Sequence, residues 1–315
     1  MAHSWAMRSA LVTGGQGFIG RNLVEALRER GVNVRTLGRR RSIDSTHIVL
    51  DEASWNSSAL SRVLEEVAPD CIFHLAGKTR GTPAELNHAN LGLIQGLLHA
   101  LRRITLRPRL VIAGSAAEYG SAIRDGEPVR ETTMCVPLSA YGASKQAQTR
   151  AALDYADATG TSVLVARIFN PLGPCMPTHL AIGDFANQIA TMPRDQGTLR
   201  VGNIDVRRDM IDVEHVATLL CQLAVNPDAR GIANVCSGQA PLLRELVEML
   251  IDGCGRKIDI EVDWARVRGN EPRAIIGSTD LLTKLGCPPP PTDFPAVIAR
   301  VCRAVETKAR RERHD

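Results

Sequence analysis

The sequence predicts an α/β protein with a doubly wound parallel sheet and a smaller C-terminal α/β lobe. Short apolar runs alternate with helix-like segments up to about residue 170, which is typical of strand–helix–strand units. The first run leads through a glycine-rich turn into a helix-like segment. After residue 170, proline and glycine become denser and the apolar segments shorten. We therefore expect one domain over residues 1–170 and, over residues 171–315, mainly a substrate-binding lobe.

The expected elements follow from hydrophobic periodicity. Strands buried on both faces are short continuous apolar runs, whereas helices place apolar residues three and four positions apart. Ligands of such sheets bind at the carboxyl ends of the strands, so we expect the lobe to close over a ligand there. The expected strands are residues 8–13, 32–37, 47–50, 70–75, 109–114 and 162–168, and the expected helices are residues 18–30, 57–67, 86–103 and 141–159.

A glycine-rich turn joins the first expected strand to the first expected helix. Residues 13–20 read Thr-Gly-Gly-Gln-Gly-Phe-Ile-Gly. Gly14 allows a tight turn, and Gly17 lets the backbone approach the pyrophosphate of a dinucleotide at the helix N-terminus. Phe18 and Ile19, at the start of the helix, are included among the expected cofactor contacts. Because strands flank this unit, it indicates a Rossmann dinucleotide site, the alternative being an ordinary glycine turn.

The end of the second expected strand indicates which dinucleotide binds. Sites for NAD commonly carry Asp or Glu there, whereas this chain has Arg39, Arg40 and Arg41. Guanidinium groups can bind a 2′-phosphate in bidentate fashion, so the sequence favours NADP(H) over NAD(H). The alternative is a solvated basic loop. Asp51, after the apolar run 48–50, is expected either to contact the adenine or to be a turn residue.

Tyr141 and Lys145 carry the expected chemistry. They are four residues apart on an expected helix and so lie on one face. A tyrosine titrates near pH 10, but a neighbouring ammonium, together with a positively charged nicotinamide in the oxidised complex, favours the phenolate, which would make Tyr141 a general acid or base at neutral pH. Ser115 follows the strand 109–114 and could hydrogen-bond a substrate oxygen. Taken singly, the tyrosine and lysine could be surface residues; with the glycine turn they indicate hydride transfer at a carbonyl or alcohol.

Composition excludes several other classes. Of the 315 residues, 44% are hydrophobic and 23% charged, the net charge is +4 and aromatics make up 3%, which does not favour nucleic-acid binding. The eight cysteines have no metal-ligand spacing and several lie in apolar runs, so we expect reduced thiols, no metal site and a cytoplasmic location. There is no signal-peptide pattern and no apolar run long enough to cross a membrane.

With these motifs in order, the chain resembles the extended short-chain dehydrogenases/reductases that modify nucleotide sugars. The resemblance spans about residues 7–305. It implies that Ser115, Tyr141 and Lys145 are catalytic. It rests on the glycine turn 13–20, His74 to Gly77, Asn90, Ser115 to Gly120, Tyr141 to Lys145, Arg167 to Pro174, and Arg208 to Val213.

The resemblance also implies binding residues. Leu75, Ala76 and Gly77 would line the cofactor, as would Asn90, which would also support the region of Lys145. The diphosphate of the sugar nucleotide would be held by Asn170 and Arg208, with Arg268 as a third contact. The family's fold further implies a homodimer through the helices at about 86–103 and 141–159.

Within the family, the residue at one position distinguishes the 4,6-dehydratases from the other enzymes. These enzymes carry an acidic residue two positions before the tyrosine of the Tyr-Gly pair, and here that position is Ala117. Glu118 is one residue further on, so the acid for elimination is missing. Glu118 itself could bind substrate or be structural.

Three C-terminal segments, 199–213, 234–238 and 262–273, are similar to reductases of the GDP-4-keto-6-deoxymannose type. This implies NAD(P)H-dependent reduction of the 4-keto group of an NDP-4-keto-6-deoxyhexose, in antibiotic glycosylation or cell-envelope synthesis, with dTDP and GDP both open. Where relatives have Asp before a proline, this chain has Glu271 before Pro272. This departure from the family pattern concerns the assignment of Arg268 as a diphosphate contact and the nucleotide preference. The alternatives are a nucleotide-sugar 4-epimerase with tightly bound NAD and a non-catalytic dinucleotide-sensing protein.

Overall fold

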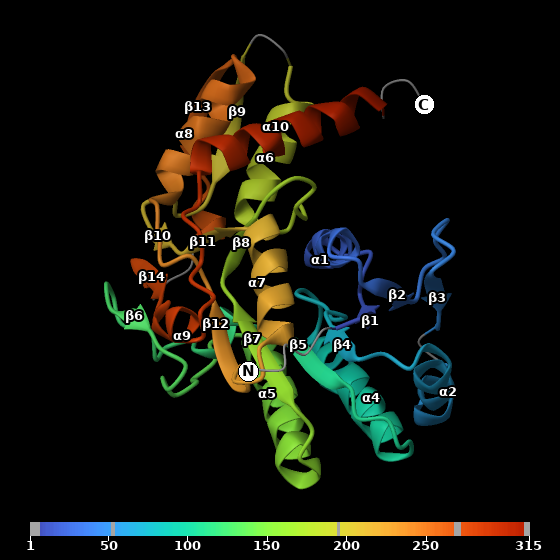
Figure 1. The fold of residues 1–315 in the computed structure, drawn as a ribbon. Coiled ribbons are helices and arrows are strands. Elements are labelled where there is room, and N and C mark those ends of the chain that lie inside the picture. Colours follow the sequence, from blue (N-terminus) through green and yellow to red (C-terminus); the bar gives the residue numbers. More distant parts are fainter. Residues whose placement is uncertain (1–6, 52–53, 194–195, 268–271, 312–315) are drawn as a thin grey trace.

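The structure of the protein is a computed structural model, and it describes residues 7–51, 54–193, 196–267 and 272–311. Within these residues, seven parallel strands form one sheet in the order β12-β7-β5-β4-β1-β2-β3 (Figure 1). The strand order reverses beside β1, as in a doubly wound sheet, so the predicted fold class is confirmed. The strands are β1 (Ser9–Thr13), β2 (Asn33–Gly38), β3 (His47–Val49), β4 (Cys71–His74), β5 (Arg109–Ser115), β7 (Val163–Ile168) and β12 (Gly231–Val235).

The last strand of this sheet comes from beyond residue 170. β12 pairs in parallel with β7, with Gly231 opposite Leu164 and Val235 opposite Ile168. It follows α7 (Val213–Val225), whose apolar face belongs to the same buried cluster as the sheet. The region after residue 170 therefore supplies both a strand and a helix to the seven-stranded sheet. The division of the chain at residue 170 stays a prediction.

Helices cover both faces of the sheet. On one face α1 (Phe18–Glu29) and α7 pack in a cluster that includes Leu23, Leu27 and Leu220. On the other face α2 (Ser57–Val67), α4 (Leu93–Arg102) and α5 (Ala140–Thr159) contribute Leu60, Leu97 and Ala152 to a second cluster. Since the central strands are buried on both sides, they are nearly continuous apolar runs, as the sequence indicated.

The helix expected over residues 86–103 is three consecutive elements. α3 (Pro83–Asn87) begins with a capping box in which Thr82 and Glu85 exchange side-chain hydrogen bonds with each other's backbone. A π-helical turn (His88–Gly92) follows, in which the Leu93 amide donates to the His88 carbonyl, and α4 continues from it. The expected helix is therefore present as one continuous helical segment, but its π-turn was missed, because apolar spacing over one turn does not distinguish a π-turn from an α-turn.

Most of the remaining strands and helices form the smaller C-terminal lobe, drawn mainly in yellow to red above the sheet in Figure 1. Its core is packed by α6 (Ala181–Thr191), α8 (Leu243–Cys254) and α10 (Phe294–Arg311). Among the described helices, none is both long and apolar enough to span a membrane. The strands pair as β8 (Asn170–Leu172) with β11 (Met210–Asp212), β9 (Gln196–Val201) with β13 (Lys257–Val262), and β14 (Ala274–Gly277) with β10 (Arg207–Arg208) and β6 (Pro128–Val129); α9 (Asp280–Lys284) and two 3-10 turns (Ala116–Glu118, Trp264–Arg266) complete the described elements.

Candidate functional site

The carboxyl ends of β1, β4 and β5 meet at one edge of the sheet. Thr13 pairs with His74, and His74 pairs with Ile112, so β1 and β4 end level and β5 continues to Ser115. The Thr13 hydroxyl lies 3.0 Å from His74 Nδ1. The glycine turn, the segment after β4 and Ser115 therefore emerge side by side, as parallel pairing requires.

The glycine turn has the geometry of a dinucleotide cradle. Gly14 has a φ of +71° and donates its amide to the Leu37 carbonyl at 3.1 Å. A Cβ atom on Gly14 would lie 2.8 Å from the Ala76 nitrogen, so no side chain fits between the two turns. α1 begins at Phe18 with Gly17 as its N-cap, and Ile19 lies in its first turn. A phosphate can therefore reach the amides of the first turn, which have no intrahelical partner.

The segment after β4 closes the other side of this cradle. The Leu75 amide donates to the Thr13 carbonyl at 3.1 Å. The Ala76 amide donates to the Thr13 hydroxyl at 3.3 Å, and Gly77 follows, exposed. The cofactor residues expected on β1 and after β4 are thus brought together.

Arg39 and Arg40 follow β2 directly and are both exposed. The loop that carries them is held by His47 on the neighbouring strand β3. His47 Nε2 lies 2.9 Å from the Arg40 carbonyl, and its Nδ1 lies 2.7 Å from the Thr36 hydroxyl. Sequence reasoning missed this role, because a histidine inside a short strand is indistinguishable from any other strand residue.

Asp51 lies just after β3 and is exposed. Its carboxylate accepts the Ser54 amide at 2.7 Å, and hydrogen bonds from Ser54 lower the pKa of Asp51. The carboxylate therefore stabilises a turn, one of the two roles left open, while a contact with adenine stays a prediction.

Ser115 and Tyr141 face each other across the carboxyl edge. Ser115 is the last residue of β5, and Tyr141 is the second residue of α5, whose N-cap Ser139 accepts the Gly142 amide at 3.0 Å. The Ser115 hydroxyl hydrogen-bonds to the Tyr141 phenol. The sequence separation of 26 residues between the two positions is closed by the loop that precedes α5.

Lys145 lies one turn further along α5 and is buried. Its Nζ donates to the Ala113 carbonyl at 2.6 Å and to Gln148 Oε1 at 2.9 Å. Burial lowers the pKa of Lys145 to about 8, although the negative charge of Glu118 raises it. The ammonium is therefore still the major form at neutral pH. His74, on the opposite side, has its pKa lowered to about 3 by burial and by the Lys145 charge, so it is neutral.

The direction of the pKa shift at Tyr141 differs from the expectation. Burial raises the pKa of Tyr141; the Ser115 hydrogen bond lowers it, and the Glu118 charge raises it. We expected the Lys145 ammonium to favour the phenolate, but Lys145 donates its hydrogen bonds to Ala113 and Gln148 instead. Tyr141 is thus held as the neutral phenol, which is the form that can donate a proton.

Asn90 lies in the π-helical turn and is fully buried. Its amide donates to the Ser144 hydroxyl at 2.8 Å and to the Lys78 carbonyl at 3.0 Å, and its oxygen accepts the Lys78 amide. Ser144 immediately precedes Lys145. Asn90 therefore connects the segment after β4 with the helix that bears Tyr141 and Lys145.

Asn170 and Arg208 come together around Asp209. Asn170 Nδ2 donates to the Asp209 carbonyl at 2.8 Å, while Arg208 is buried and donates to the Pro272 carbonyl at 2.9 Å. The Asp209 carboxylate accepts the amides of Ser237, Gly238 and Gly277 at 2.9–3.0 Å. Sequence reasoning missed Asp209 as the residue that fixes this backbone. Arg268 lies outside the described residues.

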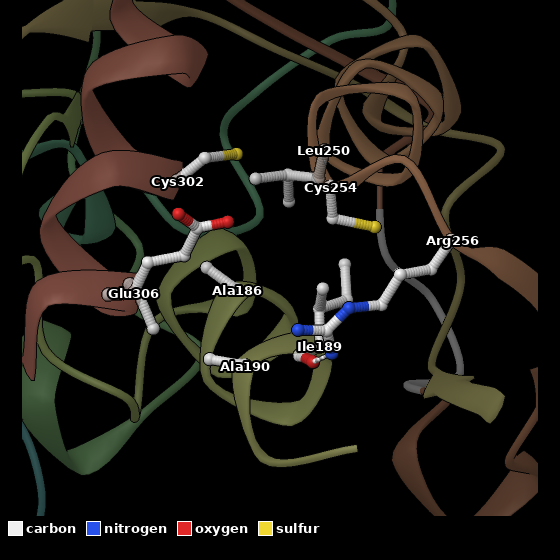
Figure 2. Close-up of a pocket in the computed structure, with 9 residues that line it drawn as sticks. Ala186, Ile189, Ala190, Leu250, Cys254, Arg256, Cys302 and Glu306 are labelled. Atoms are coloured by element: carbon white, nitrogen blue, oxygen red, sulfur yellow. Dashed lines mark hydrogen bonds between the residues drawn. The ribbon is translucent and has the colours of Figure 1, made fainter. Parts of the chain in front are cut away.

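A small pocket lies elsewhere, in the C-terminal lobe (Figure 2). It is lined by residues of α6, α8 and α10, among them Ile189, Cys254 and Cys302, and it includes none of the expected site residues. Within the part of the chain that the structure describes, no cluster of His, Cys, Asp and Glu could hold a metal ion.

Comparison with known proteins identifies the family. The model of the NAD dependent epimerase/dehydratase family matches residues 10–236. The chain belongs to this family. The resemblance to extended short-chain dehydrogenases/reductases is thereby confirmed. A dinucleotide cofactor is typical of the family, and the cradle formed by Gly14, the α1 N-terminus and Ala76 fits one.

Several individual proteins of known name or structure are similar to this chain. The chain is 35% identical over 217 residues to GDP-6-deoxy-D-mannose reductase from Pseudomonas aeruginosa, covering 67% of this chain and 71% of that protein. It is 29% identical over 255 residues to dTDP-6-deoxy-L-talose 4-dehydrogenase (NAD(P)(+)) from Kitasatospora kifunensis, covering 79% and 80%. The solved structure of RMD from Pseudomonas aeruginosa complexed with NADPH superimposes with a TM-score of 0.82 at 29% identity, covering 96% and 99%.

The shifted pKa of Tyr141 can be measured directly. The chain has three tyrosines, so a protein labelled with [13Cζ]tyrosine gives three NMR signals, and Tyr141→Phe identifies the one from Tyr141. We expect that signal to titrate above the free tyrosine value of about 10. Ser115→Ala should move it higher still, because the Ser115 hydrogen bond lowers the pKa. Titration below the free value would contradict the account of burial.

Proposed function

We propose that this enzyme reduces the 4-keto group of a nucleotide-linked 4-keto-6-deoxyhexose to a 6-deoxyhexose, with NADPH as the reductant. The observation that carries the proposal is the arrangement at the carboxyl edge of the sheet, where the Tyr141 phenol lies beside Ser115 and one helical turn before the buried Lys145. Reduction of a ketone requires a proton donor at this place, and the similarity to a GDP-6-deoxy-D-mannose reductase supports the choice of substrate.

The dinucleotide, when bound, supplies the hydride. Ser115 and Tyr141 would hold the C4 oxygen of the sugar between their hydroxyl groups, and Tyr141 would transfer its proton to that oxygen as negative charge develops there. Lys145 would stabilise the resulting phenolate by its positive charge. The hydroxyl of Ser115 would remain a hydrogen-bond donor throughout.

Binding of the nucleotide diphosphate would fall to Asn170 and Arg208. Asp209 fixes the backbone beside Arg208 through its four hydrogen bonds to Ser237, Gly238 and Gly277. A rigid guanidinium suits a bidentate contact with phosphate oxygens. Binding energy gained at this distance from C4 orients the ring for reaction. A third contact from Arg268 stays a prediction.

The surroundings of Glu118 argue against a 4,6-dehydratase. Ala117 occupies the position of the dehydratase acid, and the Glu118 side chain is fully buried in hydrogen bonds with Ser115, Thr149 and Arg167. Within the described residues of this turn, no carboxylate is directed to the substrate oxygen. Two roles were left open for Glu118, and these contacts correspond to the structural one. The homodimer and the cytoplasmic location stay predictions.

The proposed reaction can be tested with purified protein. We expect rapid NADPH oxidation with dTDP-4-keto-6-deoxyglucose or GDP-4-keto-6-deoxymannose, tested side by side, and the faster substrate would identify the base. Absence of oxidation with both, together with NAD retained through purification, would overturn the reductase in favour of a nucleotide-sugar 4-epimerase.

Tyr141→Phe should lower turnover by roughly 100- to 10,000-fold, because it removes the general acid without changing the shape of the side chain. The dissociation constant for NADPH, measured by fluorescence titration, should be close to that of the unmodified protein. Near-normal turnover would refute the assignment of Tyr141 as proton donor.

Replacing Arg39 and Arg40 with Ala should raise the KM for NADPH by about tenfold or more and leave the KM for NADH nearly unchanged, because the loss of even one charged hydrogen bond to the 2′-phosphate costs about this factor. Arg62→Ala, at an exposed position of α2, is the matched control for loss of charge. If the ratio of the two KM values does not change, the 2′-phosphate is bound elsewhere.

A further inference from the structure

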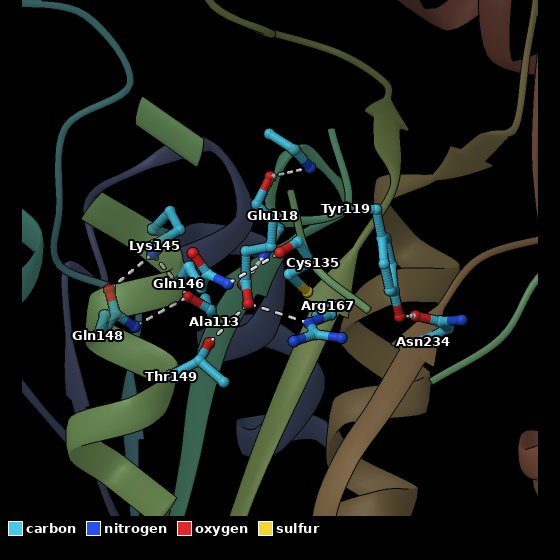
Figure 3. Close-up of polar contacts among 12 residues, drawn as sticks. Ala113, Glu118, Tyr119, Cys135, Lys145, Gln146, Gln148, Thr149, Arg167 and Asn234 are labelled. Atoms are coloured by element: carbon cyan, nitrogen blue, oxygen red, sulfur yellow. Dashed lines mark hydrogen bonds and ion pairs between the residues drawn. The ribbon is translucent and has the colours of Figure 1, made fainter. Parts of the chain in front are cut away.

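Glu118 is a fully buried carboxylate that lies between Thr149 and Arg167 (Figure 3). Its Oε1 accepts the Ser115 amide at 2.9 Å. Its Oε2 accepts the Thr149 hydroxyl at 2.9 Å and the Arg167 Nε at 3.0 Å. A single side chain thus joins the end of β5, the helix α5 and the strand β7.

Gly114 provides the space that this side chain needs. A Cβ atom at Gly114 would lie 2.8 Å from Glu118 Oε1 and 2.9 Å from Val165 Cγ1. A residue larger than glycine would push the carboxylate away from the Ser115 amide. The requirement for glycine immediately before Ser115 is therefore explained by Glu118.

Glu118 and Ser115 hold each other in place. The Ser115 hydroxyl oxygen accepts the Ala117 amide at 3.2 Å, while Glu118 accepts the Ser115 amide, which together form a capping box around the short turn Ala116–Glu118. Besides accepting the Ala117 amide, the Ser115 hydroxyl hydrogen-bonds to the Tyr141 phenol. Loss of Glu118 would release the rotation of this hydroxyl.

The contact between Glu118 and Thr149 fixes the position of α5 along its axis relative to β5. Thr149 lies four residues after Lys145 and eight after Tyr141, so all three are on one side of the helix. Movement of α5 along its axis relative to β5 would break the hydrogen bond between Thr149 and Glu118. The same movement would displace the Tyr141 phenol from Ser115.

Arg167, the third partner, is itself braced. Its guanidinium carbon lies 4.6 Å from the centre of the Tyr119 ring, and the Tyr119 hydroxyl donates to Asn234 Oδ1 at 2.6 Å. Asn234 belongs to β12, and its Nδ2 donates to the Val129 carbonyl at 2.8 Å. The position of the carboxylate is therefore set by contacts that reach the edge strand of the large sheet.

We propose that Glu118 is a positioning residue of the acid–base site, which fixes Ser115 and α5 by hydrogen bonds and places a fixed, buried negative charge beside them. The part that concerns the direction of proton transfer rests on the proposed reduction. Glu118 does not contact the substrate and acts through Ser115, Tyr141 and Lys145.

The electrostatic part has a definite sign. The charge of Glu118 raises the pKa of both Tyr141 and Lys145, so a neutral residue at this position should lower both pKa values. The alkaline limb of activity should then move to lower pH, because the proton donor and the ammonium are lost sooner. The titratable and charged groups around Glu118 and its two targets are Arg167 on β7, Tyr119 beside it, Cys135 in the loop before α5, Glu131 facing Tyr119, and His74 on β4 facing Lys145.

The test compares Glu118→Gln with Thr149→Val by [13Cζ]tyrosine NMR. Glu118→Gln removes the charge and keeps an oxygen for the Ser115 amide, so the Tyr141 signal should titrate at lower pH than in the unmodified protein. Thr149→Val removes a neutral donor and keeps the charge, so its Tyr141 midpoint should not fall. An unshifted Tyr141 midpoint in folded Glu118→Gln would overturn the proposal.

Two further variants separate charge from position. Glu118→Asp keeps the charge but shortens the side chain, so kcat should fall while the Tyr141 midpoint stays near its original pH. If Glu118→Gln does not fold because Arg167 is left buried without its partner, the double variant Glu118→Gln/Arg167→Met removes both charges. Its Tyr141 midpoint should again be lower, and a midpoint equal to that of the unmodified protein would refute the electrostatic role.

The NMR titration needs no substrate. The proposed 4-keto reduction and the proposed role of Glu118 can therefore be refuted independently of each other. An unmodified protein that reduces neither 4-keto sugar would refute the proposed function and leave the Glu118 test intact. Normal reduction of a 4-keto sugar, with the same alkaline limb and the same Tyr141 midpoint in the unmodified protein and in Glu118→Gln, would refute the role of Glu118 alone.

Discussion

Parallel pairing of β1, β4, β5 and β7 is the constraint on which the site depends. Because these strands run in one direction, every turn that leaves their carboxyl ends lies at the same edge. The glycine turn, the segment Leu75–Gly77, Ser115 and Asn170 come from stretches of chain up to about 150 residues apart, and the sheet brings them to one edge. Helices on both faces bury the strands, and this burial keeps the register fixed.

Burial also sets the chemistry of the side chains at that edge. Removing Lys145 from water disfavours its ammonium and lowers its pKa to about 8, and removing Tyr141 from water disfavours its phenolate and raises its pKa. Burial thus shifts the lysine and the tyrosine toward neutral forms, while Glu118 favours the protonated form of each. The outcome is a neutral phenol next to a cation, which is the state needed to donate a proton to a carbonyl oxygen.

Local patterns in the sequence predicted the parts of this arrangement that depend on spacing. The glycine turn after β1, the i and i+4 relation of Tyr141 and Lys145, and the alternation of strands and helices all follow from short-range geometry. The π-helical turn that carries Asn90 was missed, because it differs from an α-turn only in a hydrogen-bond offset. The return of β12 to the large sheet was missed because pairing between residues 67 positions apart, such as Gly231 and Leu164, leaves no local pattern. The role of Glu118 stayed open, because its three partners come from β5, α5 and β7, and only the fold brings them together.

In the proposed reaction, hydride passes from NADPH to the C4 carbon of a 4-keto sugar while Tyr141 protonates the C4 oxygen. Turnover with [4-2H]NADPH carrying deuterium at the transferred position, followed by NMR of the sugar product, tests this reaction. We expect one deuterium at C4 of a 6-deoxyhexose for each NADPH consumed. Deuterium at another ring carbon, or a product without deuterium despite turnover, would contradict it.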